Sequence, residues 1–388
     1  KMADQLDISA LTNDIYVSAD IVGRELNGFI PSVTMNAESS QASKGDTIKA
    51  AFTQAASAAD IVERMDMQEA DNSLTVDSKS LTLNKARRVQ IPLGGEDTRQ
   101  LQNTGQYASV YGDLITQAMR TLANEIEVEI ATALKNGAGT ATGTAGTTPF
   151  AVGSNESGVE ELLTARRFLV DQGMPTNDVA AVLNTTAGAN IRSNLKLLDH
   201  SFSNSGSLRE QGILIPIAGI NLRESGNISA HTSSGASSYA INATEAAGQT
   251  TLTVDGGSTD HVAGDVITIA SDTSGAGYVI NAHTSDTEIV INSPGLLDGA
   301  LDGNAITTAA TYLPNFVFHR NAVELAMRAP AMPLGGDMAS ESITVQDPHS
   351  GLVFQVSTYR GYHKSLIEVT AVFGVKVWKG EFVHTILG

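Results

Sequence analysis

Apolar residues recur every three or four positions in two stretches of the chain, which is the spacing of a helix that buries one face. The first stretch covers residues 8–26, and its stripe contains Ile8, Leu11, Ile15, Ala19, Val22 and Leu26. The second covers residues 105–137, and its stripe contains Tyr107, Tyr111, Leu114, Ala118, Leu122, Ile126, Ile130 and Ala133. Because Gly137 is a typical C-terminal stop, this second pattern predicts a rod of about 45 Å.

Between these two helices the apolar pattern changes to alternation, which indicates β-strands. Residues 45–52 (GDTIKAAF) and 74–93 (LTVDSKSLTLNKARRVQIPL) have this pattern, whereas residues 55–73 are polar and without a period. We therefore expect a long two-stranded ribbon with a flexible tip. Since an isolated hairpin is only marginally stable in water, the ribbon must lie against another surface.

The rest of the chain alternates between short helices and strands. Helices are predicted at 156–175, at 185–199 and over FHRNAVELAMRAP at 318–330, and strands at 178–184, at 212–225 and in most of 342–387. The glycine-rich segment 137–150 lacks the lysine and the preceding strand of a phosphate-binding loop, so we predict a flexible loop. This succession favours an α+β core.

Residues 226–314 differ from their surroundings in charge. No Lys or Arg stands between Arg223 and Arg320, whereas residues 226–314 contain nine acidic residues. Short alternating segments such as TTLTVDG and TEIVINS are separated by Gly, Asp and Ser turns, the pattern of a small antiparallel β-barrel or sandwich. Because the earlier character of the chain resumes at Phe316, we interpret the module as an insertion.

Composition excludes several functions. The 388 residues have a net charge of −18, which is unsuited to gripping nucleic acid through its phosphates. The absence of cysteine excludes disulfides, thiolate metal sites and cysteine nucleophiles. The N-terminal segment lacks the features of a secretory signal, and no apolar run is long enough to cross a bilayer, so we expect a soluble protein used inside a cell.

Two charged clusters stand out, one before the long helix and one in its second half. Basic residues Lys85, Arg87, Arg88 and Arg99 stand near Glu96 and Asp97. We interpret them as a solvated or intersubunit face, with an anion-binding site as the alternative. Glu125, Glu127 and Glu129 resemble metal ligands, but only Glu125 and Glu129 share a helical face, so a solvated or interface-facing acidic patch is favoured.

The inserted module contains further candidate metal ligands. Asp255, Asp260 and Asp265 lack the closely alternating acids of a calcium loop, and we interpret them as turn formers. His231, His261 and His283 have no spacing typical of a metal site. We therefore predict no metal and no cofactor.

Catalytic constellations have no support in the sequence. In the predicted helix 318–330, Glu324 and Arg328 have the spacing of an ion pair, and His319 and Arg320 lie largely outside the apolar side. Asp199, His200 and Ser201 are adjacent in sequence, which does not provide the geometry of a catalytic triad. No catalytic residue is assigned, and we predict that the chain is not an enzyme.

The order of these elements resembles the major capsid (coat) proteins of tailed bacteriophages, which have the Hong Kong 97-type shell fold. The resemblance is carried by LTNDIYVSADIVGRELNGFI, KGDTIKAAF, ANEIEVEIATALKNG, FHRNAVELAMRAP and GLVFQVSTYRGYHKSLIEVTAVFGVKVWKGE. The β-rich module is similar to the insertion domain of some short-tailed phage coat proteins. The resemblance implies the following division: 1–44 N-terminal arm, 45–100 extended loop, 101–172 peripheral domain with a spine helix, 173–225 and 315–345 axial domain, 226–314 inserted β domain, and 346–388 C-terminal strands that complete the core.

The function that this resemblance implies is structural. Copies of the chain would form the pentamers and hexamers of an icosahedral shell that encloses double-stranded DNA without sequence-specific binding. The implied partners are a scaffolding protein, a portal protein and, in some members, a decoration protein, with no membrane involved. The implied location is the virion capsid, assembled in the host bacterial cytoplasm. Two alternatives are a β-rich surface adhesin, for which no signal peptide is evident, and a hydrolase built on His319 or His200.

Overall fold

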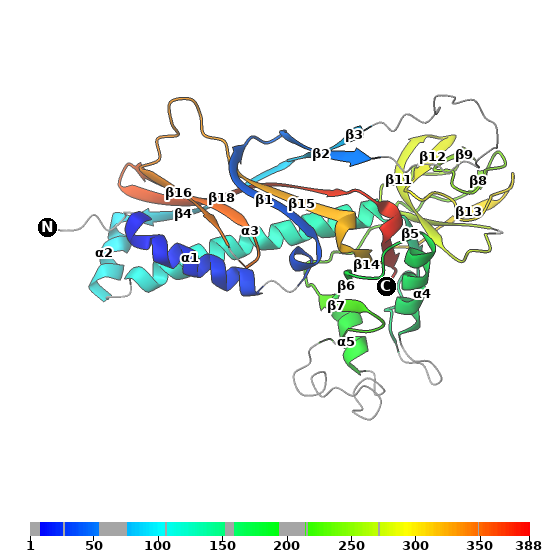
Figure 1. Ribbon diagram of the computed structural model, residues 1–388, viewed down its shortest axis with the longest axis horizontal. Coiled ribbons are helices and arrows are strands. Elements are labelled where there is room, and N and C mark those ends of the chain that lie inside the picture. Colours follow the sequence, from blue (N-terminus) through cyan, green and yellow to red (C-terminus); the bar gives the residue numbers. More distant parts are fainter. Residues whose placement is uncertain are drawn as a thin grey trace, which may run out of the picture.

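The computed structural model describes residues 8–25, 28–53, 76–104, 107–151, 159–193, 214, 216–270, 272–347 and 349–388. These residues form a six-stranded sheet backed by helices, a two-stranded ribbon, and a smaller helix-covered sheet that continues into a ring of strands (Figure 1). The chain is therefore a mixture of α and β structure, as its sequence predicts. No helix in these ranges is long and apolar enough to cross a membrane.

The largest core lies between the six-stranded sheet and two helices. The sheet has the order β1 (Thr34–Ala42), β15 (Val323–Pro330), β18 (Lys364–Val377), β17 (Val353–Gly361) and β16 (Glu341–Gln346), and β4 (Lys85–Gly94) also pairs with β18. Helices α1 (Ile8–Glu25) and α3 (Tyr107–Gly137) contact this sheet, and α3 runs along the long axis of the molecule (Figure 1). Strands β18 and β4 thus cover α3, whereas α1 packs against α3 and β16.

Both predicted helices are confirmed. Helix α3 follows the predicted stretch from residue 107 to residue 137, whereas residues 105–106 lie outside the described residues, and its stripe is buried at Tyr111, Ala118, Leu122, Ile126 and Ile130. Leu134 is buried at the end of this face, where the predicted stripe has Ala133, which is only half-buried. The stripe of α1 is buried at Ile15, Ala19 and Val22, and the short 3-10 turn η1 (Ile30–Ser32) leads into β1.

The ribbon is shorter than the predicted range 45–100. Strands β2 (Thr47–Thr53) and β3 (Val76–Thr82) pair in a separate two-stranded sheet, as expected. Residues 85–94 form β4 of the large sheet instead, because Ile91 and Leu93 join the helical core. Helix α2 (Gly95–Thr104), which the sequence pattern did not predict, follows β4. The predicted tip at 55–73 lies outside the described residues.

A smaller sheet lies beside the C-terminal end of α3. Its order is β5 (Thr140–Thr142), β19 (Val383–Ile386), β14 (Asn315–His319), β6 (Val179–Leu183) and β7 (Ile220–Glu224). Helices α4 (Glu160–Asp171) and α5 (Thr185–Ser193) share a buried core with these strands. The predicted helices around 156–175 and 185–199 and the strand at 178–184 are confirmed for their described parts. The turn η3 (Gly380–Phe382) precedes β19.

Six strands between residues 239 and 308 close into a ring. They are β8 (Tyr239–Ile241), β9 (Thr251–Asp255), β10 (Val266–Ile269), β11 (Gly277–Ser285), β12 (Glu288–Ile291) and β13 (Ala305–Thr308). The order is β10-β13-β8-β9-β12-β11, and β10 also pairs with β11, which closes the ring. We call this ring the barrel. Its interior is an apolar cluster that includes Ile241, Leu252 and Ile280, and β11 joins it to β5.

The predicted helix at 318–330 is wrong. Residues 315–319 form β14, the 3-10 turn η2 (Arg320–Ala322) follows, and residues 323–330 form β15. Strand β15 is buried on both faces, because Leu325 and Met327 join the helical core while Ala326 lies under Leu81 and Leu83 of the ribbon root. A strand that is covered on both faces carries a continuous apolar run, and such a run cannot be distinguished from a helix by periodicity.

The predicted flexible loop at 137–150 is also wrong in part, because residues 140–142 form β5 between β11 and β19. The glycines on either side allow close approach of other backbone segments. A Cβ on Gly139 would stand 2.3 Å from the carbonyl oxygen of Ser293, and Gly143 has φ of +99°. Glycine at these two positions therefore allows close packing of the backbone. The glycine-rich composition of the segment had instead suggested a flexible loop.

Candidate functional site

The ribbon formed by β2 and β3 is fixed to the molecule at its root. Leu81 and Leu83 are buried against Ala326 and Val372, and Lys376 Nζ donates a hydrogen bond to the carbonyl of Ser80 at 2.7 Å. Within the described ranges, the two strands pair with each other and with no third strand. Both outer edges of the ribbon therefore keep backbone groups open to pairing with another chain.

Exposed apolar side chains also lie on helix α1 and between β15 and β16. Helix α1 carries Tyr16, Val17 and Ile21 on the face opposite its buried stripe. The segment between β15 and β16 carries Leu334 and Met338, whose exposed fractions are 107% and 94%. Large apolar side chains that cluster in solvent mark surfaces that another molecule covers. These residues are candidate contact sites.

Two basic residues of the predicted charged face, Lys85 and Arg87, form ion pairs with glutamates of α3. Lys85 Nζ lies 3.3 Å from a carboxylate oxygen of Glu129, and Arg87 Nε lies 3.0 Å from Glu125. Both pairs form because β4 lies beside α3, a proximity that the sequence did not reveal. As partly exposed pairs, each stabilises the fold by about 0–1 kcal/mol.

The remaining charged residues of that cluster are dispersed. Arg88 Nη1 lies 3.6 Å from Glu368 of β18, whereas Arg99 is carried by α2, with Glu96 and Asp97 in the first turn of that helix. The basic residues predicted as one face are thus divided between a strand and a helix. This division weakens the alternative of a single anion-binding site.

The sequence predicted a solvated or interface-facing acidic patch at 125–129. This prediction is wrong for Glu127, which is buried. Its side chain is buried and accepts hydrogen bonds from the backbone N–H groups of Phe29 at 2.9 Å and Ile30 at 2.8 Å. The hydroxyl of Ser225 donates a third at 3.2 Å. Burial raises the pKa of Glu127, although these three donors oppose the rise. Glu127 therefore ties the turn before β1 to the long helix.

Glu324 and Arg328 form hydrogen bonds with β1 and with the end of the chain beyond β18. Glu324 accepts hydrogen bonds from Trp378 Nε1 at 2.6 Å and from Asn36 Nδ2 at 2.9 Å. Arg328 Nη1 donates to the carbonyl of Asn36 at 2.7 Å. The predicted pair between Glu324 and Arg328 does not form, because residues four apart on a strand are separated by about 13 Å.

The histidine of the same run has a structural contact. His319 is buried, and its Nδ1 accepts the backbone N–H of Asn321 at 3.2 Å in turn η2. Arg320 Nε donates to the carbonyl of Val33 at 3.3 Å. Neither contact activates a nucleophile. The other residues considered for catalysis, Asp199, His200 and Ser201, lie outside the described residues.

Asp265 holds a polar network in the barrel. Its carboxylate lies 2.8 Å from His231 Nε2, accepts the hydroxyl of Ser234 at 2.5 Å, and accepts the backbone N–H of Val262 at 3.0 Å. Burial alone would raise the pKa of Asp265, but the hydrogen bonds from His231 and Ser234 hold it below its ordinary value. The predicted turn-forming aspartate is thus a buried anchor, and His231 is its partner.

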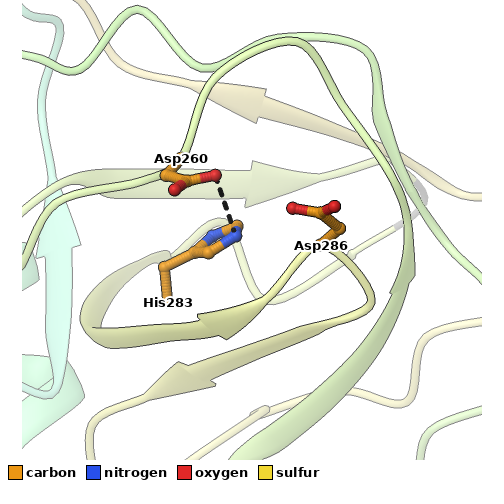
Figure 2. A group of neighbouring side chains, drawn as sticks. All are labelled: Asp260, His283 and Asp286. Atoms are coloured by element: carbon orange, nitrogen blue, oxygen red, sulfur yellow. Dashed lines mark ion pairs between the residues drawn. The ribbon is translucent and has the colours of Figure 1, made fainter.

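His261 and His283, which stand far apart in the sequence, meet in the barrel. Their ring centroids are 5.8 Å apart, with an interplanar angle of 29°, and the ring of Tyr239 contacts both. Figure 2 shows Asp260 and Asp286 beside His283, with Asp260 Oδ1 3.4 Å from His283 Nε2. Asp255 instead continues β9, opposite Ala240. Antiparallel pairing brings these residues together, and no sequence spacing signals it.

His384 is a buried histidine that the sequence analysis did not single out. It has no exposed surface, and its two ring nitrogens lie 2.7 Å from Thr140 Oγ1 and 2.9 Å from Thr142 Oγ1. Because burial disfavours the charged ring, the pKa of His384 falls to about 3. A neutral imidazole between two hydroxyls therefore links β19 to β5.

Comparisons with known proteins give similarities of structure alone, since no family profile and no curated protein matches the chain. A chain of the bacteriophage PhiM1 mature capsid is 10% identical, with 93% of this chain and 87% of that chain covered and a TM-score of 0.48. A structure from Mycobacterium phage Che8 is 14% identical, with 88% of this chain and 85% of that chain covered and a TM-score of 0.46. A virus-like particle from Pyrococcus furiosus is 7% identical, with 96% of this chain and 98% of that chain covered and a TM-score of 0.43. At these values the likeness alone assigns no function.

Proposed function

We propose that this chain is the major capsid protein of a tailed double-stranded DNA bacteriophage, with the Hong Kong 97-type shell fold that its sequence resembles. Copies would assemble as pentamers and hexamers into an icosahedral shell around the genome. The protein would be structural and not an enzyme. It would be assembled in the cytoplasm of the host bacterium, on a scaffolding protein and around a portal, and would remain in the virion capsid.

The observation that carries this proposal is the ribbon of β2 and β3. A two-stranded sheet cannot bury enough apolar surface to be stable by itself in water. This one is packed at its root on Ala326 and Val372, while its paired strands extend over residues 47–53 and 76–82. A shell lattice provides the missing cover, because each subunit of a closed assembly lies against neighbours on every side.

The exposed apolar residues support the same function. Tyr16, Val17 and Ile21 on α1 and Leu334 and Met338 between β15 and β16 belong to segments far apart in the sequence. Several separate contact surfaces are what a subunit with several neighbours requires, whereas a monomeric enzyme would bury them. The net charge of −18 also suits a container from which DNA must be released.

The structure supports a proposed division of the chain into the parts of a capsid subunit. Helix α1 would be the N-terminal arm, the ribbon would be the extended loop, and α3 would be the spine helix of the peripheral domain. The predicted axial domain covers 173–225 and 315–345. Because β15 and β16 pair within the large sheet, the axial domain would instead be the smaller sheet with α4 and α5, and the barrel within 226–314 would be the inserted domain. The chain leaves the smaller sheet after β7 and returns to it at β14, as an insertion requires.

Electron microscopy of the purified protein, co-expressed with its scaffolding protein, tests this function. We expect hollow closed shells of uniform size from the unchanged chain. The double variant Leu334→Asp and Met338→Asp should give folded subunits but few shells, because burying two carboxylates at a contact is costly. The matched control, Leu334→Met with Met338→Leu, should assemble normally.

Circular dichroism separates a folding defect from an assembly defect in these variants. A chain that stays monomeric at high concentration, with and without the scaffolding protein, would contradict the proposed function. If the aspartate variant forms normal shells, Leu334 and Met338 do not belong to a contact surface. The proposed function would then rest on the ribbon.

A further inference from the structure

We propose that Asp260, His283 and Asp286 form a binding site on the barrel for a divalent transition-metal ion of the zinc type. One ligand atom from each of the three residues lies within 4.8 Å of the other two. The proposal concerns the barrel alone and does not depend on the proposed function.

Three different elements supply the three side chains. Asp260 lies in the connection between β9 and β10, His283 lies in β11, and Asp286 lies in the turn that joins β11 to β12. The turn is held beside the end of β9, because the backbone N–H of Val254 donates to the carbonyl of Thr287 at 3.0 Å. Figure 2 shows both carboxylates directed toward the imidazole. The site is thus assembled by the pairing of β11 and β12.

The state of His283 points to a ligand. Its side chain is only 6% exposed, and its Nε2 is buried without a hydrogen-bond partner. The nearest carboxylate oxygen of the cluster, on Asp260, is 3.4 Å away. Because a buried polar atom without a hydrogen-bond partner destabilises the fold, such atoms are uncommon in native proteins. A metal ion bound to Nε2 would satisfy it.

The surroundings of His283 fix its ring in place. The rings of Tyr239 and His261 pack against it with centroid distances of 5.8 Å each. The backbone N–H of His261 donates to Nδ1 at 3.4 Å, a long hydrogen bond that must break before Nδ1 can carry the ring proton and leave Nε2 free to bind a metal. An orientation held by packing lowers the cost of forming the site.

Charge also favours a cation at this position. The two aspartates are exposed, and residues 226–314 contain nine acidic residues and no Lys or Arg that could neutralise them. A divalent ion would remove this repulsion between the two carboxylates.

The ligand atoms, one imidazole nitrogen and two carboxylate oxygens, indicate the class of ion. Calcium and magnesium prefer oxygen ligands throughout, whereas an imidazole nitrogen suits zinc and related ions. In a tetrahedral zinc site, ligand atoms stand about 3.3 Å apart, so the present group must close by roughly 1–1.5 Å. Exposed aspartate side chains can make that movement. With three protein ligands, the fourth position is open to water.

Titration calorimetry of the metal-free full-length protein with Zn²⁺ tests the site. We expect one Zn²⁺ per chain. Asp260→Asn and Asp286→Asn should each weaken binding by at least about ten-fold, since even substitutions beyond the ligands often cost 10–100-fold. Asp255→Asn is the matched control, because it removes an exposed carboxylate of the same barrel outside the cluster, and it should bind as the unchanged chain does.

Co²⁺ and a third variant make the test specific. Co²⁺ in the site should give the strong visible absorption of tetrahedral coordination, and Asp260→Asn should lose it. His283→Gln should also lose Zn²⁺; if this variant does not fold, the double variant Asp260→Asn with Asp286→Asn replaces it. Zn²⁺ binding that survives in the double variant, no binding in the unchanged chain, or equal affinity for Ca²⁺ would each overturn the proposal.

Discussion

The carboxylate of Glu127 accepts the backbone N–H of Ile30 at 2.8 Å, although 97 residues separate the two positions. A second oxygen of the same carboxylate accepts the N–H of Phe29. These bonds satisfy two backbone donors at the beginning of turn η1, which are unpaired within the turn itself. One acidic residue of the long helix thereby holds turn η1, which leads into β1.

Replacement of Glu127 by alanine should destabilise the fold by about 2–4 kcal/mol, because it leaves the two backbone N–H groups buried and unpaired. Chemical denaturation of the unassembled subunit measures this difference. The matched control is Glu125→Gln, which removes only the exposed pair with Arg87 and should cost less than about 1 kcal/mol. Equal losses in the two variants would show that Glu127 has no special role.

Acidification should destabilise the fold through His384. The pKa of this residue falls from an ordinary value of 6.5 to about 3 on burial, so its contribution is complete above pH 6.5 and is lost progressively as the pH falls toward 3. At pH 5 the expected loss from this residue is about 2 kcal/mol. Urea unfolding at pH 7.5 and 5.0 should show a smaller difference for His384→Gln than for the unchanged chain.

Proline at the centre of the long helix α3 should prevent folding. Leu122 is 1% exposed in the middle of α3, and Leu122→Pro removes a helical hydrogen bond and adds a steric clash that together cost about 3 kcal/mol or more. We expect insoluble protein. Leu122→Met, which conserves volume, should stay soluble, and a soluble, fully helical proline variant would contradict the assignment of α3 as a core helix.

The barrel should fold when residues 226–314 are expressed alone. Its six strands close on one another around their own apolar cluster. Separation breaks the pairing of β11 with β5 and the hydrogen bonds from Asn292 Nδ2 to the carbonyls of Asn136 and Ala138. A well-dispersed NMR spectrum is expected. A disordered spectrum would mean that β5 is needed to complete the barrel.

Local pattern was sufficient for several elements. The stripe from Tyr111 to Ile130 predicts α3, because a helix that buries one face repeats its apolar residues with the period of its own backbone. The alternation in residues 251–255 and 288–291 likewise predicts β9 and β12. The lack of Lys and Arg between Arg223 and Arg320 indicated a separate module, within which the barrel lies.

Side-chain partners could not be predicted in the same way, since they depend on which elements lie together. The three glutamates of 125–129 look alike in the sequence, yet Glu125 and Glu129 pair with β4 while Glu127 is buried under η1. Asp260, His283 and Asp286 likewise converge only because β11 and β12 form a hairpin beside the end of β9. Both groups of residues depend on long-range pairing.

The amino-acid sequence by itself determined the long helix, the paired ribbon strands, the barrel strands and the acidic character of their module, because these follow from periodicity and composition over neighbouring residues. Only the tertiary structure decided that residues 323–330 are a strand, that β4 leaves the ribbon for the large sheet, and that His384 is buried and neutral. A strand covered on both faces has no periodic signal, and burial of a single polar residue is set by segments that are distant in sequence.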